Sequence, residues 1–487
     1  MLGEHEPNPQ ISFLLPPVLL PSAKRDLLQA LKQLVDWSVF RELARPYFSA
    51  GGRPSIDPVV MVKMMVVGLL FDFRSDRRLV EECSDSRALE EFLGYQPGEP
   101  LPVHASFTHW RQRLGPDFFR AALHQVVAQA QALGMPLSPG RSVDGTSVKA
   151  QAGKQGPKIE MPVGADPVAF VAQFFAGEVA PADPAQEPTV PVNLHDPEAR
   201  LQRTKGETAE FRYCASVSTC TETGLICDAE ATPREQAATA VEHVRHDPVG
   251  VTEIALDRLY DEGAALGALQ AEQVTCYVPR TNHDKAGQLS KDEFTYHADA
   301  DEYECPAGQR LRHTRYDPKR QQHFYTARQA VCRHCPRKAE CTPANRRVIS
   351  RADSEPARTM AVRSGLRYDE LQTRRRVNEH VHLLGKRDHG LRRARGIGLA
   401  AMRIQVCLTA LAINLKKLVR WTQVQRAEAQ AQRAQFAQLG QLAQLAQTTQ
   451  EPVRAFFFAL RAGLRQALGG RWGAGAPRRG VLRPRTA

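Results

Sequence analysis

The stretch FRYCASVSTCTETGLICDAEAT, residues 211–232, decides the fold class. Its side chains alternate as in two half-buried strands, and TETG stands where a hairpin would turn. Before it, RSVDGTSVKA (141–150) predicts another strand, and after it EQAATAVEHVRH (235–246) has helical spacing. Two further strands are expected in VTEIALDRLYD (251–261) and TCYVPRT (275–281). A long antiparallel hairpin within a mixed chain predicts an α+β fold rather than a simple βαβ repeat.

The region before this sheet predicts short helices with capped starts. Residues 20 to about 135 contain SAKRDLLQALKQL, a long apolar helix after Asp57 or Pro58, and the segments SDRRLVEECSD, SRALEEFLGY and HASFTHWRQRL. Arginines near such starts, among them Arg111 and Arg113, suit a helix-turn-helix-like module that binds DNA. A generic helical bundle with solvated basic faces explains the same pattern equally well.

Changes of composition predict the domain organisation. A helical domain (1–135) precedes the first part of a mixed-sheet domain (136–284), which includes a flexible insertion (151–200) rich in Pro, Ala, Asp and Glu. A cysteine-rich insertion (285–350), further helices (351–421) and a Gln/Ala-rich, basic tail (422–487) complete the chain. We expect about the last 15 residues to be disordered and to add loose affinity for phosphates.

Composition and charge restrict the class of protein. The 487 residues include 65 Lys and Arg against 53 Asp and Glu, a net charge of +12 that favours a polyanionic partner. The start, MLGEHEPNPQ, is acidic before a short apolar run, unlike a signal peptide, and no apolar run approaches the roughly 20 residues that cross a bilayer. A secreted or membrane protein is therefore not expected, and the predicted location is the cytoplasm.

Three acidic residues stand apart from ordinary surface charge. Asp144 lies on a predicted strand, Asp257 ends the apolar stretch EIAL, and Glu379 lies on a helix among many arginines. Carboxylates at strand ends, joined by one from a later helix, can converge on one cleft and bind hard divalent cations through oxygen. Two cations held about 4 Å apart activate a water or a 3′-hydroxyl in phosphodiester chemistry.

Each of these residues also has a purely structural interpretation. Asp144 precedes a glycine, as turn residues do, and Asp257 could cap the following helix. Glu379 could pair with Arg375, four residues earlier. The nearest rival acids are Glu253, Asp261 and Glu370.

Four of the ten cysteines fall in the polar segment 285–350. Cys305 begins CPAG, and Cys332, Cys335 and Cys341 follow in CRHCPRKAEC. A C-x2-C pair supplies two zinc ligands from one tight turn, so this segment predicts a Zn²⁺ module. Reduced cysteines in a small β insert are the alternative, and His323 and His334 are possible substitute ligands. The other six cysteines are expected to be small buried hydrophobic residues.

Three ordered blocks of the sequence resemble the bacterial insertion-sequence transposases of the DDE class, in the branch with a helical N-terminal domain and a cysteine-rich insert. The first block is GGRPSIDPVVMVKMMVVGLL with SDRRLVEECSDSRALEEFLGY and SFTHWRQRL. The second comprises SVDGTSVKA, DPEARL, GLICDAEATP and ALDRLYD. The third is RRRVNEHVHLLGKRDHGLRRARGIGLAAMRIQVCLTALAINLKKL. Together they cover most of residues 10–421, apart from the insertion.

The resemblance implies an RNase H-like catalytic domain that binds Mg²⁺, or Mn²⁺, through Asp144, Asp257 and Glu379. It also implies that Arg375 and Lys386 contact phosphates at the transposon end.

The resemblance leaves two aromatic positions to interpret. Gln372 occupies the place of a tyrosine that recurs in related transposases, so the role of that tyrosine is unfilled or supplied elsewhere. Tyr260 matches the aromatic residue that commonly follows the second aspartate, and either stacks on a base or belongs to the core.

The activity implied is binding to the terminal inverted repeats of the element, Mg²⁺-dependent strand cleavage and transfer of the 3′-hydroxyl to target DNA. A homodimer or higher assembly is expected, because two ends must be processed together. A metal-dependent nuclease of the same fold and an inactive DNA-binding remnant are the alternatives. All three acids are present, which weighs against the remnant.

Overall fold

The computed structural model describes residues 3–4, 22–152, 157–203, 206, 208–280, 288–448, 459–460 and 462–463. The chain divides into two compact units, Met1–Lys417 and Leu418–Ala487. The short apolar run near the start of the chain and the predicted disordered end lie outside the described residues.

The N-terminal region is helical, as predicted. Predicted caps start three of the seven helices in its described residues, whereas the predicted cap Ser86 makes no side-chain hydrogen bond at the start of its helix. Its helices are α1 (Ala23–Leu34), α2 (Val39–Ala44), η1 (Arg45–Tyr47), α3 (Pro58–Leu70), α4 (Asp76–Asp85), α5 (Arg87–Leu93) and α6 (His104–Ala132). The side chains of Ser22, Asp57 and Ser75 accept backbone N–H groups at the starts of α1, α3 and α4. Helix α6 has no side-chain cap, so the predicted serine start is wrong there, and it kinks at Gly115 before Pro116.

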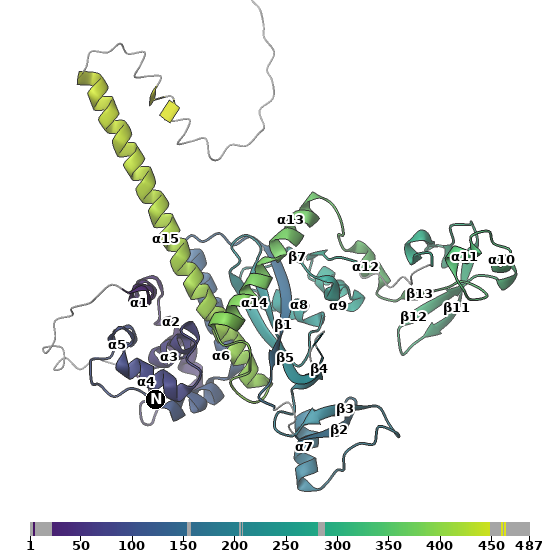
Figure 1. Ribbon diagram of the computed structural model, residues 1–487, viewed down its shortest axis with the longest axis horizontal. Coiled ribbons are helices and arrows are strands. Elements are labelled where there is room, and N and C mark those ends of the chain that lie inside the picture. Colours follow the sequence, from purple (N-terminus) through teal and green to yellow (C-terminus); the bar gives the residue numbers. More distant parts are fainter. Residues whose placement is uncertain are drawn as a thin grey trace, which may run out of the picture. The chain divides into compact units, whose positions relative to one another are not determined.

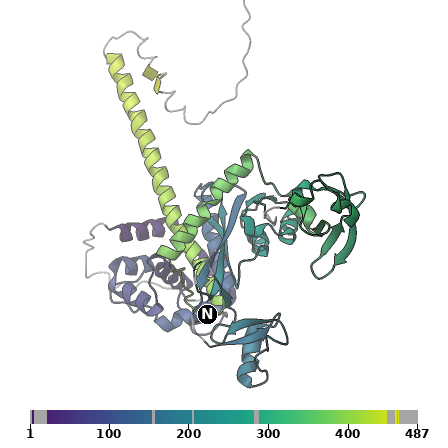
Figure 2. The ribbon, with the colours of Figure 1, turned by 45° about the vertical axis from the view of Figure 1, so that its right-hand side comes forward.

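The central sheet is mixed, which confirms the predicted α+β class and the RNase H-like mixed sheet (Figures 1 and 2). Its order is β4-β5-β1-β7-β8, with β6 also paired to β5. The strands are β1 (Gly140–Lys149), β4 (Arg200–Gln202), β5 (Glu210–Cys220), β6 (Ile226–Thr232), β7 (Glu253–Ala255) and β8 (Thr275–Tyr277). The hairpin β5–β6 is antiparallel and β5 runs antiparallel to β1, whereas β1, β7 and β8 are mutually parallel.

Helices α8 (Ala238–His246) and α9 (Gly263–Ala271) share a core with this sheet. The core joins Val143 of β1 and Ile254 of β7 to apolar residues of both helices. Between β7 and α9 lies the short helix η2 (Arg258–Tyr260). Helices α12 (Glu355–Met360), α13 (Leu366–Arg375) and α14 (Val377–Asp388) follow later in the chain, and α13 and α14 both contact β1.

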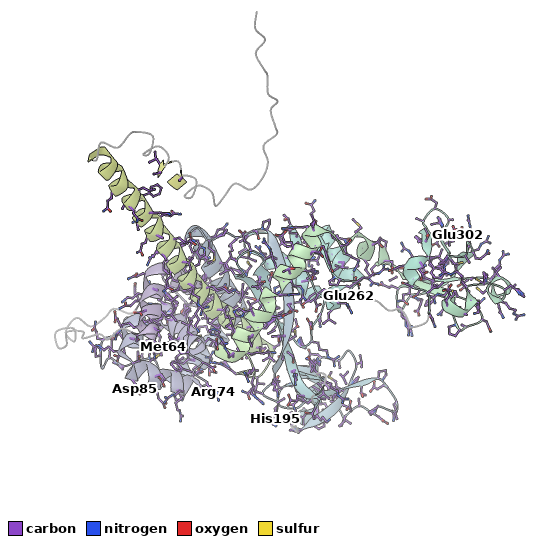
Figure 3. All side chains as sticks on the ribbon, turned by 45° about the horizontal axis from the view of Figure 1, so that its top comes forward. Met64, Arg74, Asp85, His195, Glu262 and Glu302 are labelled. Atoms are coloured by element: carbon purple, nitrogen blue, oxygen red, sulfur yellow. The ribbon has the colours of Figure 1, made fainter. Side chains whose placement is uncertain are left out.

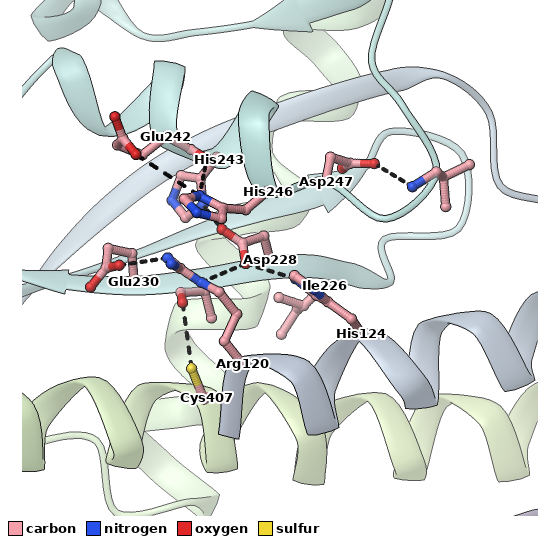
Figure 4. A network of polar contacts seen from close by, with 12 residues as sticks. Arg120, His124, Ile226, Asp228, Glu230, Glu242, His243, His246, Asp247 and Cys407 are labelled. Atoms are coloured by element: carbon pink, nitrogen blue, oxygen red, sulfur yellow. Dashed lines mark hydrogen bonds and ion pairs between the residues drawn. The ribbon is translucent and has the colours of Figure 1, made fainter. Parts of the chain in front are cut away.

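A buried charged network joins α6 to the sheet (Figure 4). Asp228 of β6 lies 2.9 Å from His124 Nε2, 3.1 Å from Arg120 Nε and 2.7 Å from His243 Nδ1. Arg120 also contacts Glu230 at 2.5 Å. Burial opposes ionisation of Asp228, but the hydrogen bonds with His124 and His243 and the charge of Arg120 hold its pKa well below the ordinary value. The network thus fixes α6 against the central sheet and α8.

The predicted flexible insertion contains regular structure. Strands β2 (Lys158–Pro162) and β3 (Thr189–Asn193) pair antiparallel, and α7 (Pro167–Ala176) lies between them in the chain. Met161, Phe170, Val171 and Val192 form a small core of their own. The apolar run PVAFVAQFFA (167–176) begins after the cap Asp166 and ends before Gly177, so local signals for α7 were present in the sequence.

The cysteine-rich insertion forms a second sheet, in the order β13-β12-β11-β10-β9. Its elements are η3 (Lys291–Glu293), β9 (Thr295–His297), β10 (Glu302–Glu304), β11 (Arg310–Asp317), β12 (Gln322–Thr326), α10 (Gln329–Arg333), α11 (Lys338–Cys341) and β13 (Val348–Ala352). Glu302, labelled in Figure 3, pairs with Arg310 across β10 and β11.

Helix α15 (Leu399–Thr448) begins in the first unit and ends in the second. In the first unit Asn414 accepts from Ile226 N at 2.9 Å and donates to Ile226 O at 2.7 Å. By length and composition its segment Leu399–Gln441 could cross a membrane, unlike the prediction that no run would reach that length. However, 72% of the apolar window is buried inside the protein, as in a core helix.

Candidate active site

The pairing of β1 with β7 brings the first two predicted carboxylates to one edge of the sheet. The strands are parallel and in register from Gly140 opposite Glu253 to Ser142 opposite Ala255. The same register places Asp144 level with Asp257, two residues further along. Side chains alternate along strands, so residues at equal register project from the same face. The sheet therefore positions two carboxylates that are far apart in the sequence.

Asp257 has a local structural role as well. One of its carboxylate oxygens, Oδ1, accepts the N–H of Leu259 at 2.7 Å and caps η2. The capping interpretation made from the sequence is thus correct for Asp257, and this hydrogen bond holds the carboxylate at the end of β7.

Helix α14 carries the third carboxylate, Glu379, and the buried Asn378 beside it fixes the helix to the sheet. Asn378 is fully buried, donates to Ser142 Oγ at 2.7 Å and accepts from Thr219 Oγ1 at 2.6 Å. Ser142 and Thr219 face each other on β1 and β5. These bonds fix the first turn of α14 on the sheet, so the exposed Glu379 stands beside β1.

The ionisation of Asp144 reflects this clustering. Burial raises the pKa of Asp144 to about 6; the charge of Arg375 opposes the rise, whereas the charges of Asp257 and Glu379 add to it. The three predicted carboxylates and Arg375 therefore act on one another. Since like charges disfavour joint ionisation, a bound cation would relieve a repulsion that the fold builds in.

Two residues near Asp144 were missed by sequence reasoning. His382 lies three residues after Glu379 on α14, with Nε2 3.8 Å from Asp144 Oδ2, and this buried nitrogen has no hydrogen-bond partner. Burial lowers the pKa of His382 to about 4, with Lys386 adding to the effect. Glu235 is exposed overall, yet its carboxylate lies against Gly145, and burial with the charges of Asp257 and Asp144 raises its pKa to about 7. Glu235 precedes α8 and has no periodic signal that would have identified it.

Gly145 leaves room for the carboxylate of Glu235 because it has no Cβ. A Cβ at position 145 would stand 2.8 Å from Glu235 Oε1 and 2.8 Å from Cys214 Sγ. We predict that Gly145→Ala destabilises the protein by about 1–3 kcal/mol through overpacking. Thermal unfolding measures this, with Gly51→Ala as the control because a Cβ there meets nothing within 4 Å. Equal melting temperatures for the two variants would contradict the contact.

Gln372, at the position of the expected tyrosine, joins α13 to the sheet. Its Nε2 donates to Leu256 O at 3.1 Å and to Tyr277 O at 3.0 Å, and its Oε1 accepts from Arg375 Nε at 3.3 Å. Gln372 therefore holds the residue that precedes Asp257 and orients Arg375. The departure from the family pattern has a structural role in this chain.

The rival acids are engaged in ion pairs. Asp261 accepts from Arg358 at 2.7 Å and from Arg363 at 2.8 Å, with no exposed side-chain surface. The carboxylates of Glu253 and Glu370 both pair with Arg367, and Glu370 also pairs with Arg374. Their carboxylates stabilise the fold around the site.

Three of the predicted DNA contacts take other roles in the structure. Tyr260 is 1% exposed within the core between β7 and α9, so the prediction that it stacks on a base is wrong, and the core interpretation holds. Arg111 makes two 2.7 Å hydrogen bonds to Asp76, which occupy its guanidinium. Arg113 lies over the ring of Phe48 at 5.0 Å. A phosphate would have to compete with Asp76 for Arg111.

Lys386, by contrast, lines a basic cavity of about 550 Å³. The cavity joins the loop after α3 to the end of α14 and the segment that follows. Its lining side chains include the cations Arg74, Lys386, Arg387, Arg392, Arg393 and Arg395. Arg395 is held by Asp72 at 2.9 Å, and Arg74 is labelled in Figure 3. Such a concentration of guanidinium groups suits a polyanionic backbone.

The chemistry of the acidic cluster fits a hard divalent cation, because it offers carboxylate oxygens from three elements. The partnerless Nε2 of His382 faces the same carboxylate. No group of three or more His, Cys, Asp or Glu side chains is close enough to hold a metal ion as it stands in the described ranges. Cys305, Cys332, Cys335 and Cys341 line a separate small cavity in the β9–β13 module.

Comparison with known proteins gives two family matches. Residues 19–113 match the model described as Transposase domain (DUF772), and residues 304–419 match the model described as Transposase DDE domain. The second match includes Glu379 but neither aspartate. No curated protein matches the chain. One solved structure, of the piggyBac transposase synaptic complex with hairpin DNA, is 9% identical over 81% of this chain and 78% of that one, with a TM-score of 0.29.

Proposed function

Because two regions of the chain match transposase domain models, we propose that it binds the terminal inverted repeats of its own element, cleaves DNA there and transfers the freed 3′-hydroxyl to target DNA. The observation that carries the proposal is that Asp144 on β1 and Asp257, two residues beyond the paired strand β7, lie close enough for their charges to act on each other. Glu379 stands beside them on a helix that Asn378 fixes to the same sheet.

Asp144, Asp257 and Glu379 would hold Mg²⁺ or Mn²⁺. When bound, this cation activates the attacking oxygen and stabilises the leaving oxygen of the phosphodiester. The protein keeps the three carboxylates on rigid elements through the β1–β7 pairing and the Asn378 hydrogen bonds. Gln372 orients Arg375 toward the same edge, where a guanidinium can neutralise a phosphate.

The basic cavity supplies the site for the DNA backbone in this proposal. We predict that Arg74→Ala weakens binding to DNA of any sequence and reduces the slope of log K against log salt concentration by about one. Fluorescence anisotropy over a salt series measures this. Arg78→Ala is the control, because Arg78 lies on exposed α4 and pairs with Glu81 and Glu82. An unchanged slope for Arg74→Ala would remove the cavity from the DNA interface.

The deciding experiment is cleavage of a plasmid that carries the flanking ends of the element, with and without Mg²⁺. Wild type is expected to cut at the ends only with the metal, and Asp257→Asn is expected not to cut. Glu370→Gln, an exposed acid on α13, is the matched control and should cut normally. Specific cleavage without joining to target DNA would favour a nuclease. End binding without any cleavage would indicate an inactive remnant, and equal cutting by Asp257→Asn would reject the assigned site.

A further inference from the structure

The four cysteines of the β9–β13 module, which we call the thiol cluster, surround one small cavity. Cys305 directly follows β10, Cys332 lies in α10, Cys335 lies between the two short helices and Cys341 ends α11. All four thiols are free, and they line a cavity of about 30 Å³. Cysteines almost 40 residues apart in the sequence thus line the same small cavity.

The two short helices carry Cys332 and Cys341, with Cys335 between them, and they bury little apolar surface. Helices α10 and α11 have five and four residues, and neither contains a fully buried residue. Helices this short are not stable by themselves. The apolar core of the module consists mainly of residues from the sheet and the segment before it, and only Cys305, Cys332 and Cys341 among the cluster pack against it. The helices therefore lack the apolar burial that usually holds a helix to a sheet.

The turn at Cys305 has the local geometry of a ligand turn. Its backbone N–H donates to Gln309 O at 2.8 Å, its carbonyl accepts from Gly308 N at 2.8 Å, and its Sγ accepts the N–H of Gln309 at 3.3 Å. Gly308 takes a φ of 72°, which favours glycine. An N–H directed at sulfur stabilises a thiolate, which is the form that binds metal.

Charges around the cluster also suit bound thiolates. Lys338 and Arg347 line the cavity, and Arg347 donates to Cys341 O at 2.9 Å and to Leu289 O at 2.8 Å. Burial raises the pKa of the Cys341 thiol; Arg347 opposes this, and the other three cysteines each add to it. Cys341 therefore lies within electrostatic reach of each of the other three cysteines.

We propose that the thiol cluster binds one structural Zn²⁺, which fastens α10 and α11 to β10. Zinc prefers four soft ligands in a tetrahedron, and closed sites of four cysteines are structural. Each thiol releases its proton to solvent as its sulfur binds the metal. Among the described residues no three of these side chains stand close enough to hold a metal as they are, so binding would require the thiols to turn toward the cavity that they line. His323 does not belong to it, because it contacts His313 and Asp353.

Metal analysis tests this proposal on the full chain, purified under reducing conditions without chelator. We expect about one zinc per chain, and Co²⁺ in its place should give the visible bands and thiolate charge-transfer absorption of a tetrahedral sulfur site. Cys332→Ser and Cys335→Ser should each lose the metal. Cys276→Ser, in a buried strand of the central sheet, is the matched control and should keep it. Asp144→Asn should also keep it, which separates this site from the acidic one.

Hydrogen exchange tests the fastening role. Removal of the metal should speed exchange in residues 329–341 while the central sheet stays protected. Absence of zinc together with absence of the cobalt bands would overturn the proposal, even if the serine variants failed to fold. Two disulfides among the four cysteines under reducing conditions would overturn it too. Because none of these measurements uses DNA, a failure of strand cleavage leaves the zinc result unaffected.

Discussion

Asp144→Asn is expected to lower the rate of DNA strand cleavage on the order of 10³-fold while leaving the protein folded and able to bind DNA. Asparagine keeps the shape of the side chain but removes a charge that the reaction needs. Asp144 is central to the cluster, since Asp257, Glu379, His382 and Arg375 all act on it or lie near it. Single-turnover cleavage of an end substrate measures the rate, and anisotropy with the same DNA measures binding.

The same substitution should not reduce stability. Because burial raises the pKa of Asp144 to about 6, the folded protein retains a proton that the unfolded chain has lost above a pKa of about 3.9. The contribution of Asp144 is therefore fully present below about pH 4 and is lost as pH rises toward 6. At about pH 7.5 the ionised carboxylate disfavours folding, so the melting temperature of Asp144→Asn should equal or exceed that of wild type.

Addition of Mg²⁺ should change the melting temperatures of the two proteins by different amounts. Mg²⁺ should raise the melting temperature of wild type, because a ligand that binds only the folded state stabilises it. The rise should be small or absent in Asp144→Asn. Undiminished cleavage by the variant would place the metal elsewhere. A lower melting temperature for the variant would mean that the Asp144 carboxylate has a stabilising partner.

Asp228→Asn is expected to destabilise the protein by about 3–5 kcal/mol, since it removes the fully buried carboxylate of a charged network whose Arg120 and His124 are partly exposed. Arg120, His124 and His243 would lose their shared carboxylate while remaining between α6, β6 and α8 (Figure 4). Denaturant unfolding measures the loss. Glu242→Gln, an exposed acid on α8, is the control and should stay within about 0.5 kcal/mol of wild type.

The pH dependence of stability separates the charge of Asp228 from its shape. Its pKa is lowered in the folded protein, so its contribution is present above the unfolded pKa of about 3.9 and is lost as pH falls toward the folded value. Wild type should lose stability in acid more steeply than Asp228→Asn below about pH 4. Parallel curves for the two proteins would show that the network does not depend on this ionisation.

The elements of this protein follow largely from local sequence. Ser22, Asp57 and Ser75 begin helices because their side chains bond N–H groups two or three residues ahead, which requires no tertiary contact. The alternation of residues 211–232 likewise predicts the β5–β6 hairpin, which turns at TETG. In the insertion, Asp166 caps α7 in the same local way, whereas Phe170 and Val192 contribute to a core only when β2, α7 and β3 assemble.

For the site, the sequence alone identified the three carboxylates as candidates, because of their places at predicted strand ends and on a helix and because of the resemblance to a family. It also identified the cysteine-rich segment. Only the tertiary structure decided which groups surround them: the level register of Asp144 and Asp257, the approach of Glu235 and His382, and the burial of Tyr260. The physical reason is the distance along the chain over which each kind of interaction acts. Caps and periodicity act within about four residues, whereas strand pairing and burial join residues about a hundred positions apart, and these long-range contacts set the ionisation of the site.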